Sequence, residues 1–260
     1  YYFLTENSGT PATMPDESIP APPRTMKAFP DHSIIDNDEF SFINAGRTYF
    51  ENYDFGTGSI HTYTLHLPGI TTGDVTLDVQ FGAASTKASS LTLSSGENTL
   101  TTINFTPLVD YLYADVRQKS CKWSNVVSEN PVLKMTYKRN ATSSAHLDYI
   151  QASYQRSLRI PQQGFLAFRT PDNFNYIAEI SGATDGTKVW KVTSPEKMKM
   201  QEGKYSAGTY TVNLACSNYD EYVAVNTNAT FAAPEVVGTI ANQDLHSLSA
   251  IDLVIVVPSN

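Results

Sequence analysis

The chain has 260 residues, of which 41% are hydrophobic and 17% charged, a composition typical of a globular protein and too apolar for a disordered one. Its formal net charge of -8 argues against a nucleic-acid binder, which would need a basic face. No apolar run is long enough to cross a bilayer as a helix, and the only two cysteines, Cys121 and Cys216, form neither a disulfide framework nor a zinc pattern.

The first 45 residues predict a strand followed by a Pro-rich linker. The segment YYFLT is typical of a strand, and it has neither the basic region nor the apolar core of a signal peptide. Residues 7–30 are rich in Pro, Ser and Thr, and Pro22 and Pro23 exclude both a helix and a central strand. We therefore interpret residues 1–45 as a strand and a Pro-rich linker or strap.

An acidic stretch, Asp36–Phe40, follows the Pro-rich segment. It resembles a calcium loop only loosely, because it lacks the Gly and the distal Glu of an EF-hand. A structural calcium is therefore a hypothesis for this stretch, and we expect no other cofactor.

Alternating apolar and polar residues predict a β-sandwich over residues 46–160. In DVTLDVQFGAAS, the residues Val75, Leu77, Val79 and Phe81 share one face of a strand. The stretch SSLTLSSGENTLTTINF predicts a hairpin that turns at Ser95 and Gly96. Short strands with frequent turn signals indicate an all-β fold, and we expect a jelly-roll-like sandwich.

A second, smaller β unit is predicted over residues 161–243. The segment Arg159–Gly164 carries Pro and Gly and interrupts the rhythm of strands. The phrases FLAFRTP, NYIAEISGA, TKVWKVTSP, GTYTVNLAC and EYVAVNT each read as a short strand. These strands could equally extend the sheets of the first unit.

The chain closes on LVIVV, Leu253–Val257, which is apolar on both faces. Such a run is typical of a central strand in a parallel sheet, and a parallel neighbour needs a crossover of a dozen or more residues. We therefore interpret residues 244–260 as the first strand of an α/β domain that the chain does not complete.

We expect structural roles for both cysteines. Lys119 and Lys122 lie beside Cys121, and cations lower the pKa of a thiol. A cysteine nucleophile also needs a base, usually His, so we expect Cys121 to be a β-sheet cysteine with exposed lysine neighbours. Its basic stretch, Arg117–Trp123, is interpreted as a solvated strand end or loop. Cys216, in the apolar phrase NLACSN, is interpreted as a packing residue of a strand.

The histidines do not predict a metal site. His61 and His66 have an odd spacing, which places them on opposite faces of one regular strand. His146 and Asp148 share a face, and we expect a structural cross-strand arrangement there. The motifs G-x-S-x-G, P-loop and G-x-G-x-x-G are absent, so we predict no catalytic, cofactor-binding or metal-binding residue in this chain.

Five phrases, in order, resemble the segment that precedes the peptidase domain of gingipain-type cysteine peptidases. They are GRTYFEN (Gly46–Asn52), LDYIQASYQRSL (Leu147–Leu158), VWKVTSP, EYVAVNT and VGTIANQDLHSLSAIDLVIVVPS. The resemblance covers nearly the whole chain and is greatest to the sortase-like members that work in type IX secretion. Tyr49 stands where Trp is usual, the Gly-Glu after Phe50 is absent, and Lys191 stands where Asp is usual.

The resemblance implies that the incomplete α/β domain is caspase-like and that its catalytic His and Cys lie beyond Asn260. The chain itself would be non-catalytic, and the full-length parent would be a peptidase whose Cys attacks a peptide carbonyl. Such an enzyme is expected to remove C-terminal sorting domains from exported cargo and to join the cargo to a surface lipopolysaccharide. The implied partners are the downstream catalytic domain, secreted cargo and other type IX components, at the outer membrane or cell surface of a Gram-negative bacterium.

Two alternatives remain open from the residues. One is a surface carbohydrate-binding or adhesin-like β-sandwich, in which Trp123 and Trp190 would stack on sugars and Asp36–Glu39 would hold calcium. Burial of both tryptophans would remove its best anchors. The other alternative is an independent hydrolase that uses Cys121.

Overall fold

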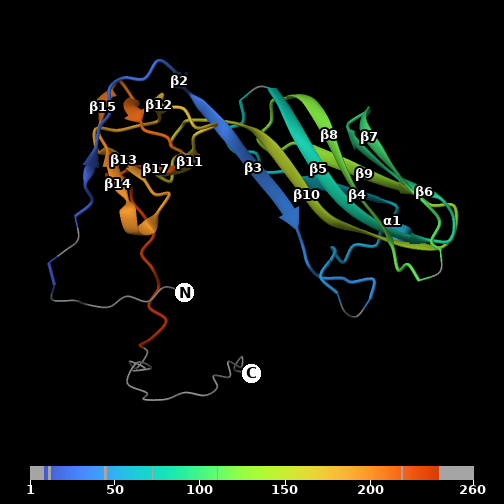
Figure 1. The fold of residues 1–260 in the computed structure, drawn as a ribbon. Coiled ribbons are helices and arrows are strands. Elements are labelled where there is room, and N and C mark those ends of the chain that lie inside the picture. The colour runs from blue at the N-terminus through green and yellow to red at the C-terminus, as the bar shows by residue number, and fades with distance from the viewer. Residues whose placement is uncertain are drawn as a thin grey trace. The chain divides into compact units, whose positions relative to one another are not determined.

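The structure is a computed structural model that describes residues 9–10, 13–43, 46–71, 73–109, 111–217 and 219–239. The described elements are almost all strands, with one helical turn, α1 (Phe55–Gly58), and a short 3-10 turn, Pro195–Lys197. The predicted all-β fold class is therefore confirmed. The chain divides into two compact units, residues 1–229 and 230–260, and the described strands all lie in the first of these (Figure 1).

Two four-stranded antiparallel sheets form what we call the first β unit. Their strand orders are β3-β10-β5-β8 and β4-β9-β6-β7. The strands of the first sheet are β3 (Ala28–Asp36), β10 (Ser143–Ser157), β5 (Gly73–Ser85) and β8 (Asp115–Val126). Those of the second sheet are β4 (Ile60–Thr64), β9 (Val132–Lys138), β6 (Ser89–Ser95) and β7 (Asn98–Phe105).

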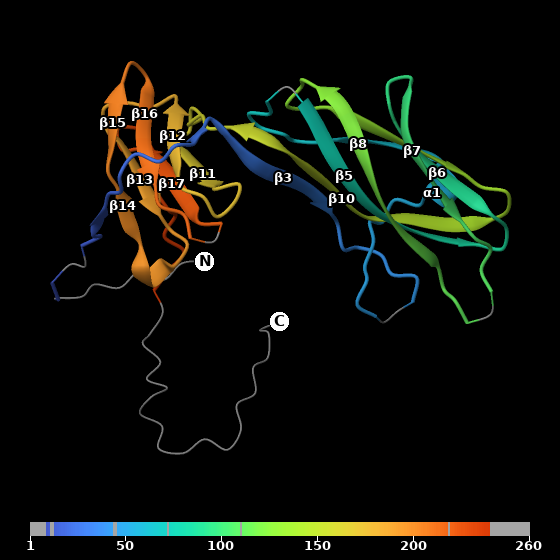
Figure 2. The same cartoon turned by 45° about the horizontal axis from the view of Figure 1, so that its top comes forward.

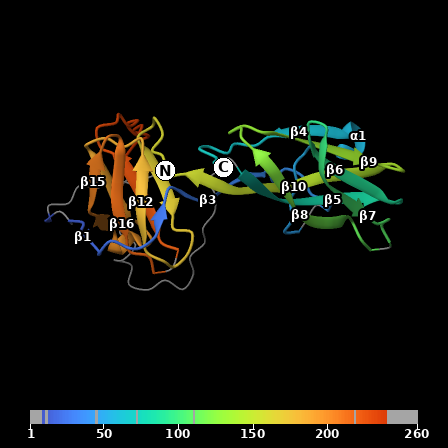
Figure 3. The ribbon, with the colours of Figure 1, turned by 90° about the horizontal axis from the view of Figure 1, so that it is seen from above.

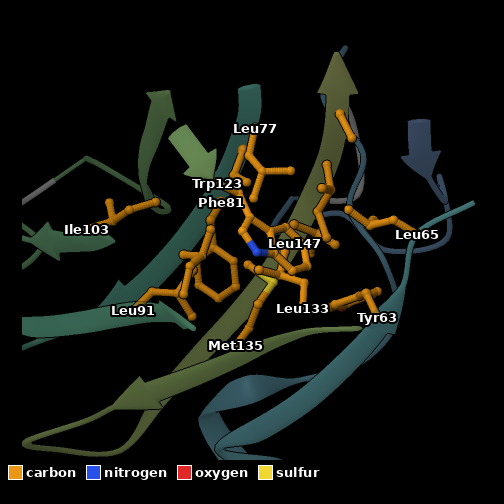
Figure 4. Packing of buried hydrophobic residues seen from close by; sticks show 14 of the residues in the cluster. Tyr63, Leu65, Leu77, Phe81, Leu91, Ile103, Trp123, Leu133, Met135 and Leu147 are labelled. Carbon is orange, nitrogen blue, oxygen red and sulfur yellow. The ribbon is translucent and has the colours of Figure 1, made fainter. Parts of the chain in front are cut away.

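The core of the first β unit lies between these sheets. The predicted inward face of β5, with Val75, Leu77, Val79 and Phe81, is fully buried. Figure 4 shows Leu77 and Phe81 packed beside residues of β6, β9 and β10 that include Leu91, Leu133, Met135 and Leu147. Full burial of each such side chain stabilises the fold by about 1.5–3 kcal/mol. The predicted hairpin is also confirmed, because β6 pairs with β7 and Gly96 turns between them with φ 55°.

Two further sheets form the second β unit, with strand orders β1-β14-β13-β17-β11 and β15-β16-β12-β2. Their strands are β1 (Asp16–Glu17), β2 (Thr25–Met26), β11 (Phe165–Arg169), β12 (Tyr176–Ser181), β13 (Thr187–Lys191), β14 (Lys199–Gln201), β15 (Gly203–Ser206), β16 (Thr209–Leu214) and β17 (Glu221–Asn226). A second hydrophobic core lies among them, separate from the first.

The Pro-rich segment, for which a linker or a strap was predicted, pairs with the second β unit. Residues 13–27, which we call the strap, contribute β1 in parallel to β14 and β2 in parallel to β12. Residues 28–36, predicted as part of the linker, instead form β3, which pairs along its length with β10. Pro30 fits there because β3 is an edge strand, whose outer N–H groups have no neighbouring strand to bond.

The second β unit is discontinuous in sequence. Met26 of the strap and Phe29 of β3 lie in its core with Leu158, Ile160 and residues up to Ala224. The first β unit is thus inserted between the strap and the rest of the second β unit, through the paired strands β3 and β10 (Figure 3). The sequence predicts this unit at residues 161–243. Its described strands instead begin at Asp16, with β1, and end at Asn226, with β17. The strands predicted at YYFLT and at Leu253–Val257 lie outside the described residues.

Candidate functional site

A cluster of polar side chains surrounds His146 on β10, on the face of the sheet that points away from the first core. His146 is only 2% exposed. Its Nδ1 lies 2.9 Å from the carbonyl oxygen of Glu51, and its Nε2 lies 2.9 Å from Ser144 Oγ. Asp54 Oδ1 lies 3.8 Å from the same Nε2. Both ring nitrogens are therefore occupied by partners from the protein.

Aromatic rings enclose the other side of His146. The ring of Phe40 stacks on the imidazole, and Phe42 meets it edge-on at a centroid distance of 5.4 Å. The neighbouring residue on β5 is Gly82, and a Cβ there would lie 2.8 Å from Phe42 and 2.9 Å from Phe50. Only glycine leaves room for this packing, which holds Phe42 and Phe50 on the outer face of the sheet.

Asp54 organises the polar side of the cluster. Its side chain caps α1 by accepting a hydrogen bond from Gly56 N at 2.7 Å, and it also accepts one from Ala145 N at 2.9 Å. The guanidinium of Arg139 donates to the carbonyl of Gly56. Burial lowers the pKa of His146, against the opposing effects of the Glu51 carbonyl and the Asp54 carboxylate. The imidazole is therefore neutral at neutral pH, and a neutral ring needs no buried counter-ion.

Ser144, His146 and Asp54 are the residue types of a hydrolase triad, but their geometry is not that of a triad. In a working triad the nucleophile and the carboxylate bond opposite nitrogens of the imidazole. Here Ser144 and Asp54 both lie near Nε2, and Nδ1 faces a backbone carbonyl. The cluster of His146 with Phe40, Glu51 and Asp54 is structural, and we call it the His146 clamp. Sequence reasoning missed it because Asp54 and His146 meet only through the folding of the chain.

Asp148 does not bond to His146, although the two were singled out together. The register of β10 shifts between Leu147 and Tyr149, and Asp148 accepts a hydrogen bond from Gln80 Nε2 at 2.6 Å. Burial, with smaller contributions from Asp36 and Asp38, raises the pKa of the Asp148 carboxyl. Asp36 and Asp38 of the acidic stretch therefore help to keep the Asp148 carboxyl protonated to higher pH. Among the described residues, no group of three or more His, Cys, Asp or Glu could hold a metal ion, and the structural calcium stays a prediction.

His61 and His66 are not brought together. The ring of His61 lies among those of Tyr53, Phe55 and Tyr63. The exposed His66 has its Nδ1 3.2 Å from Asn130 Oδ1. Their separate surroundings give no common ligand site.

Cys121 lies in the middle of β8, opposite Leu77 of β5. Burial raises the pKa of its thiol, Asp78 adds to this, and Lys119 opposes it only in part. The two lysines therefore do not activate Cys121, and the Lys122 ammonium instead lies 2.5 Å from Asp74. The basic stretch is the centre of an edge strand, whereas a strand end or loop was expected.

Cys216 follows β16 and is not part of a strand, which corrects the expectation for NLACSN. Its thiol lies 2.8 Å from Thr170 Oγ1 and donates to the carbonyl of Asp172 at 3.1 Å. In the described part of the chain, no histidine is among the hydrogen-bond partners of either cysteine. Neither thiol has the base that a cysteine nucleophile needs.

The two tryptophans have different surroundings. Trp123 is buried in the first core, which removes it as a sugar-stacking anchor, and Trp190 on β13 is half-buried. An open hollow of about 520 Å³ lies between strap residues and Asn173–Asn175. In it, the guanidinium carbon of Arg24 lies 3.6 Å from the centroid of the exposed Phe174 ring. The described residues form no helix that is long and apolar enough to cross a membrane.

Comparison with known proteins shows a likeness to a solved structure. No family model matches the chain, and no curated protein matches it. Among solved structures, dimeric latent PorU from Porphyromonas gingivalis superposes with a TM-score of 0.74 and 17% identity, covering 92% of this chain and 24% of that chain. This chain therefore spans about a quarter of the length of the PorU chain.

Two further solved structures superpose only poorly. The Eiger TNF from S. frugiperda has a TM-score of 0.24 and 10% identity, over 50% of this chain and 93% of that one. PNGF-II has a TM-score of 0.27 and 8% identity, over 75% of this chain and 61% of that one. The likeness to PorU shows that this chain is similar in fold to a β-rich part of PorU.

Proposed function

We propose that this chain is the non-catalytic β-rich segment of a PorU-like cysteine peptidase of the gingipain family. The observation that carries this proposal is the likeness of fold to PorU over 92% of the chain. Two features support it. Five phrases resemble the family segment in order, and the described residues bring together no cysteine and histidine that could act on a peptide bond.

In this proposal, the segment supports a downstream peptidase domain that processes the C-terminal sorting domains of type IX secretion cargo. The parent protein is exported and works at the outer membrane or cell surface of a Gram-negative bacterium. Its partners are the peptidase domain, secreted cargo and other type IX components. The His146 clamp and the two hydrophobic cores suit this role, because they make a rigid scaffold out of short strands.

The test compares the parent polypeptide with this chain and with the downstream domain alone. This chain by itself should release no product from peptide substrates. The downstream domain should unfold at a lower temperature without this chain than with it. Turnover by this chain that disappears in Cys121→Ala would contradict the proposal. A peptidase domain whose melting temperature and activity are the same with and without this segment would contradict it as well.

A carbohydrate-binding module is the second candidate, and the hollow beside Arg24 and Phe174 favours it. An exposed aromatic ring with nearby amide and guanidinium donors is a common way to hold a sugar. Binding to a glycan array that is lost in Phe174→Ala and kept in Phe165→Ala, a change at another exposed Phe, would support this candidate.

A further inference from the structure

The sheet β1-β14-β13-β17-β11 of the second β unit carries apolar side chains on both of its faces. Those that point inward belong to the second core: Leu166, Phe168, Val189, Tyr222 and Ala224. The residues that alternate with them along the same strands point outward, and six of these are also apolar. We call them the apolar face: Phe165, Ala167, Trp190, Met200, Val223 and Val225.

The strand register makes the side chains of the apolar face neighbours. One row crosses four paired strands: Ala167, Val223, Trp190 and Met200. In the adjoining row, Phe165 lies opposite Val225. Side chains that lie directly opposite each other on one face of a sheet are close enough to interact. The six residues, all at least partly exposed, therefore form one continuous apolar surface.

The other sheet of the second β unit has a polar outward face. The outward residues of β16 are Thr209, Thr211 and Asn213. The strap crosses this side, where Asn213 Nδ2 donates to the carbonyl of Ile19 and Ile177 N donates to that of Arg24 (Figure 2). Antiparallel sheets usually present polar residues on the face that meets water. The apolar face departs from this pattern, and soluble monomers rarely expose such a surface without a binding role.

Charged side chains of both signs border the apolar face. Lys188 lies opposite Val225, and Asp16 lies on the outermost strand, β1. At another border, Arg169 Nη2 lies 3.6 Å from Glu221 Oε1. An apolar centre inside a polar rim is the usual anatomy of a protein–protein interface. A rim of mixed sign on a chain with a net charge of -8 does not suit an anionic lipid surface.

We propose that the downstream peptidase domain of the parent protein packs on the apolar face, an inference that rests on the function proposed above. This chain spans only 24% of the PorU chain, so a parent of that length has further polypeptide to cover the face. The last described strand is β17, which itself supplies Val223 and Val225. The chain therefore leaves the second β unit beside the apolar face, and a domain on a short tether has a high effective concentration there.

Oxidative footprinting read by mass spectrometry tests this proposal on the parent polypeptide and on this chain alone. Trp190 and Phe165 should be oxidised at least about threefold more slowly in the parent, because the centre of an interface excludes water. The matched control is Phe174, which is 52% exposed against 51% for Phe165 and lies at the hollow beside Arg24. The oxidation rate of Phe174 should be the same in the two proteins.

A pair of substitutions gives a second measurement. In the parent, Phe165→Ser should lower the melting temperature of the peptidase domain by at least about 2 °C, because it removes an apolar contact from the interface. Phe174→Ser should leave that temperature unchanged. Circular dichroism of this chain alone verifies that both variants stay folded.

Equal oxidation of Trp190 and Phe165 in the parent and in this chain alone would overturn the proposal, as would a Phe165→Ser parent that melts like Phe174→Ser. If the peptidase domain nevertheless melts at a lower temperature without this chain, the proposed function stands and only the face is wrong. Protection of Trp190 that rises with the concentration of this chain alone would assign the face to a second copy, and would overturn the proposal too.

Discussion

The imidazole of His146 lies flat on the ring of Phe40, with the two centroids 3.8 Å apart and the two planes 13° apart. The stack joins the beginning of β10 to a segment that follows the end of β3, far away in the sequence. Together with the bond from Nδ1 to the Glu51 carbonyl, it fixes Phe40 and Glu51 against the sheet. His146 is therefore one of the residues that hold this outer segment on the first β unit.

The stability of the first β unit should depend on pH through His146. Burial lowers the pKa of His146 in the folded chain, while the unfolded chain titrates near about 6.5. As the pH falls below about 6.5, the unfolded state binds the proton first, so the free energy of unfolding decreases. The decrease ends once the folded state is protonated as well.

Urea unfolding above and below this pH measures the effect. His146→Gln should lower stability at neutral pH by about 1–3 kcal/mol, because it breaks a buried hydrogen-bonded contact, and should flatten the pH dependence. The exposed His66 is the matched control, and His66→Gln should keep the slope of the unmodified protein. An unchanged slope in His146→Gln would show that other groups cause the pH dependence.

Gly82→Ala should destabilise the first β unit. The added Cβ would lie 2.8 Å from Phe42 and 2.9 Å from Phe50, so the two rings must move and loosen the aromatic packing around His146. Overpacking of this kind costs about 1–3 kcal/mol. The control is Gly73→Ala on the same strand, where the nearest atom lies 3.8 Å away. Equal melting temperatures for the two variants would contradict this account of the packing of Phe42 and Phe50 on Gly82.

Met26→Ala should destabilise the second β unit even though Met26 precedes the whole first β unit in sequence. Met26 is buried in the second core, and truncating a buried Met costs about 2–5 kcal/mol. The chain has two tryptophans, so Trp123→Phe leaves Trp190 as the sole indole and the reporter on the second β unit.

In that background, Met26→Ala should move the Trp190 fluorescence transition to lower urea. Met198→Ala, at an exposed methionine, should change stability by less than about 0.5 kcal/mol. If Met26→Ala leaves the urea midpoint of the Trp190 transition unchanged, the strap does not belong to the second core in solution.

Cys121 should react slowly with thiol reagents at neutral pH. Burial raises the pKa of its thiol, and only the thiolate is a nucleophile. In a Cys216→Ser background, the labelling rate should stay below that of a free cysteine and should still be rising above about pH 8.5. Unfolding in urea supplies the free-thiol rate as a control. If Cys121 is labelled faster in the folded chain than in this control, its thiol is activated and the prediction is wrong.

The strand periodicity of the sequence determined the all-β class and the inward faces of the central strands. Val75, Leu77, Val79 and Phe81 could be assigned to the core because side chains alternate across a strand with a period of two. The hairpin at Gly96 followed from local turn chemistry in the same way. Both signals are carried by neighbours in the chain, so the sequence alone was sufficient.

Tertiary structure decided the features that depend on distant partners. The strap forms β1 and β2 because it pairs with the edges of β14 and β12. The local sequence of a Pro-rich stretch does not show that such an edge lies beside it in the fold. Strand β8 was interpreted only as a strand end or loop, because its residues 116–120 are all exposed and show no alternation of buried and exposed side chains. The contacts of His146 with Phe40, Glu51 and Asp54 form only when the chain folds. His146 lies far from the other three residues in sequence, so no local pattern predicts that they meet.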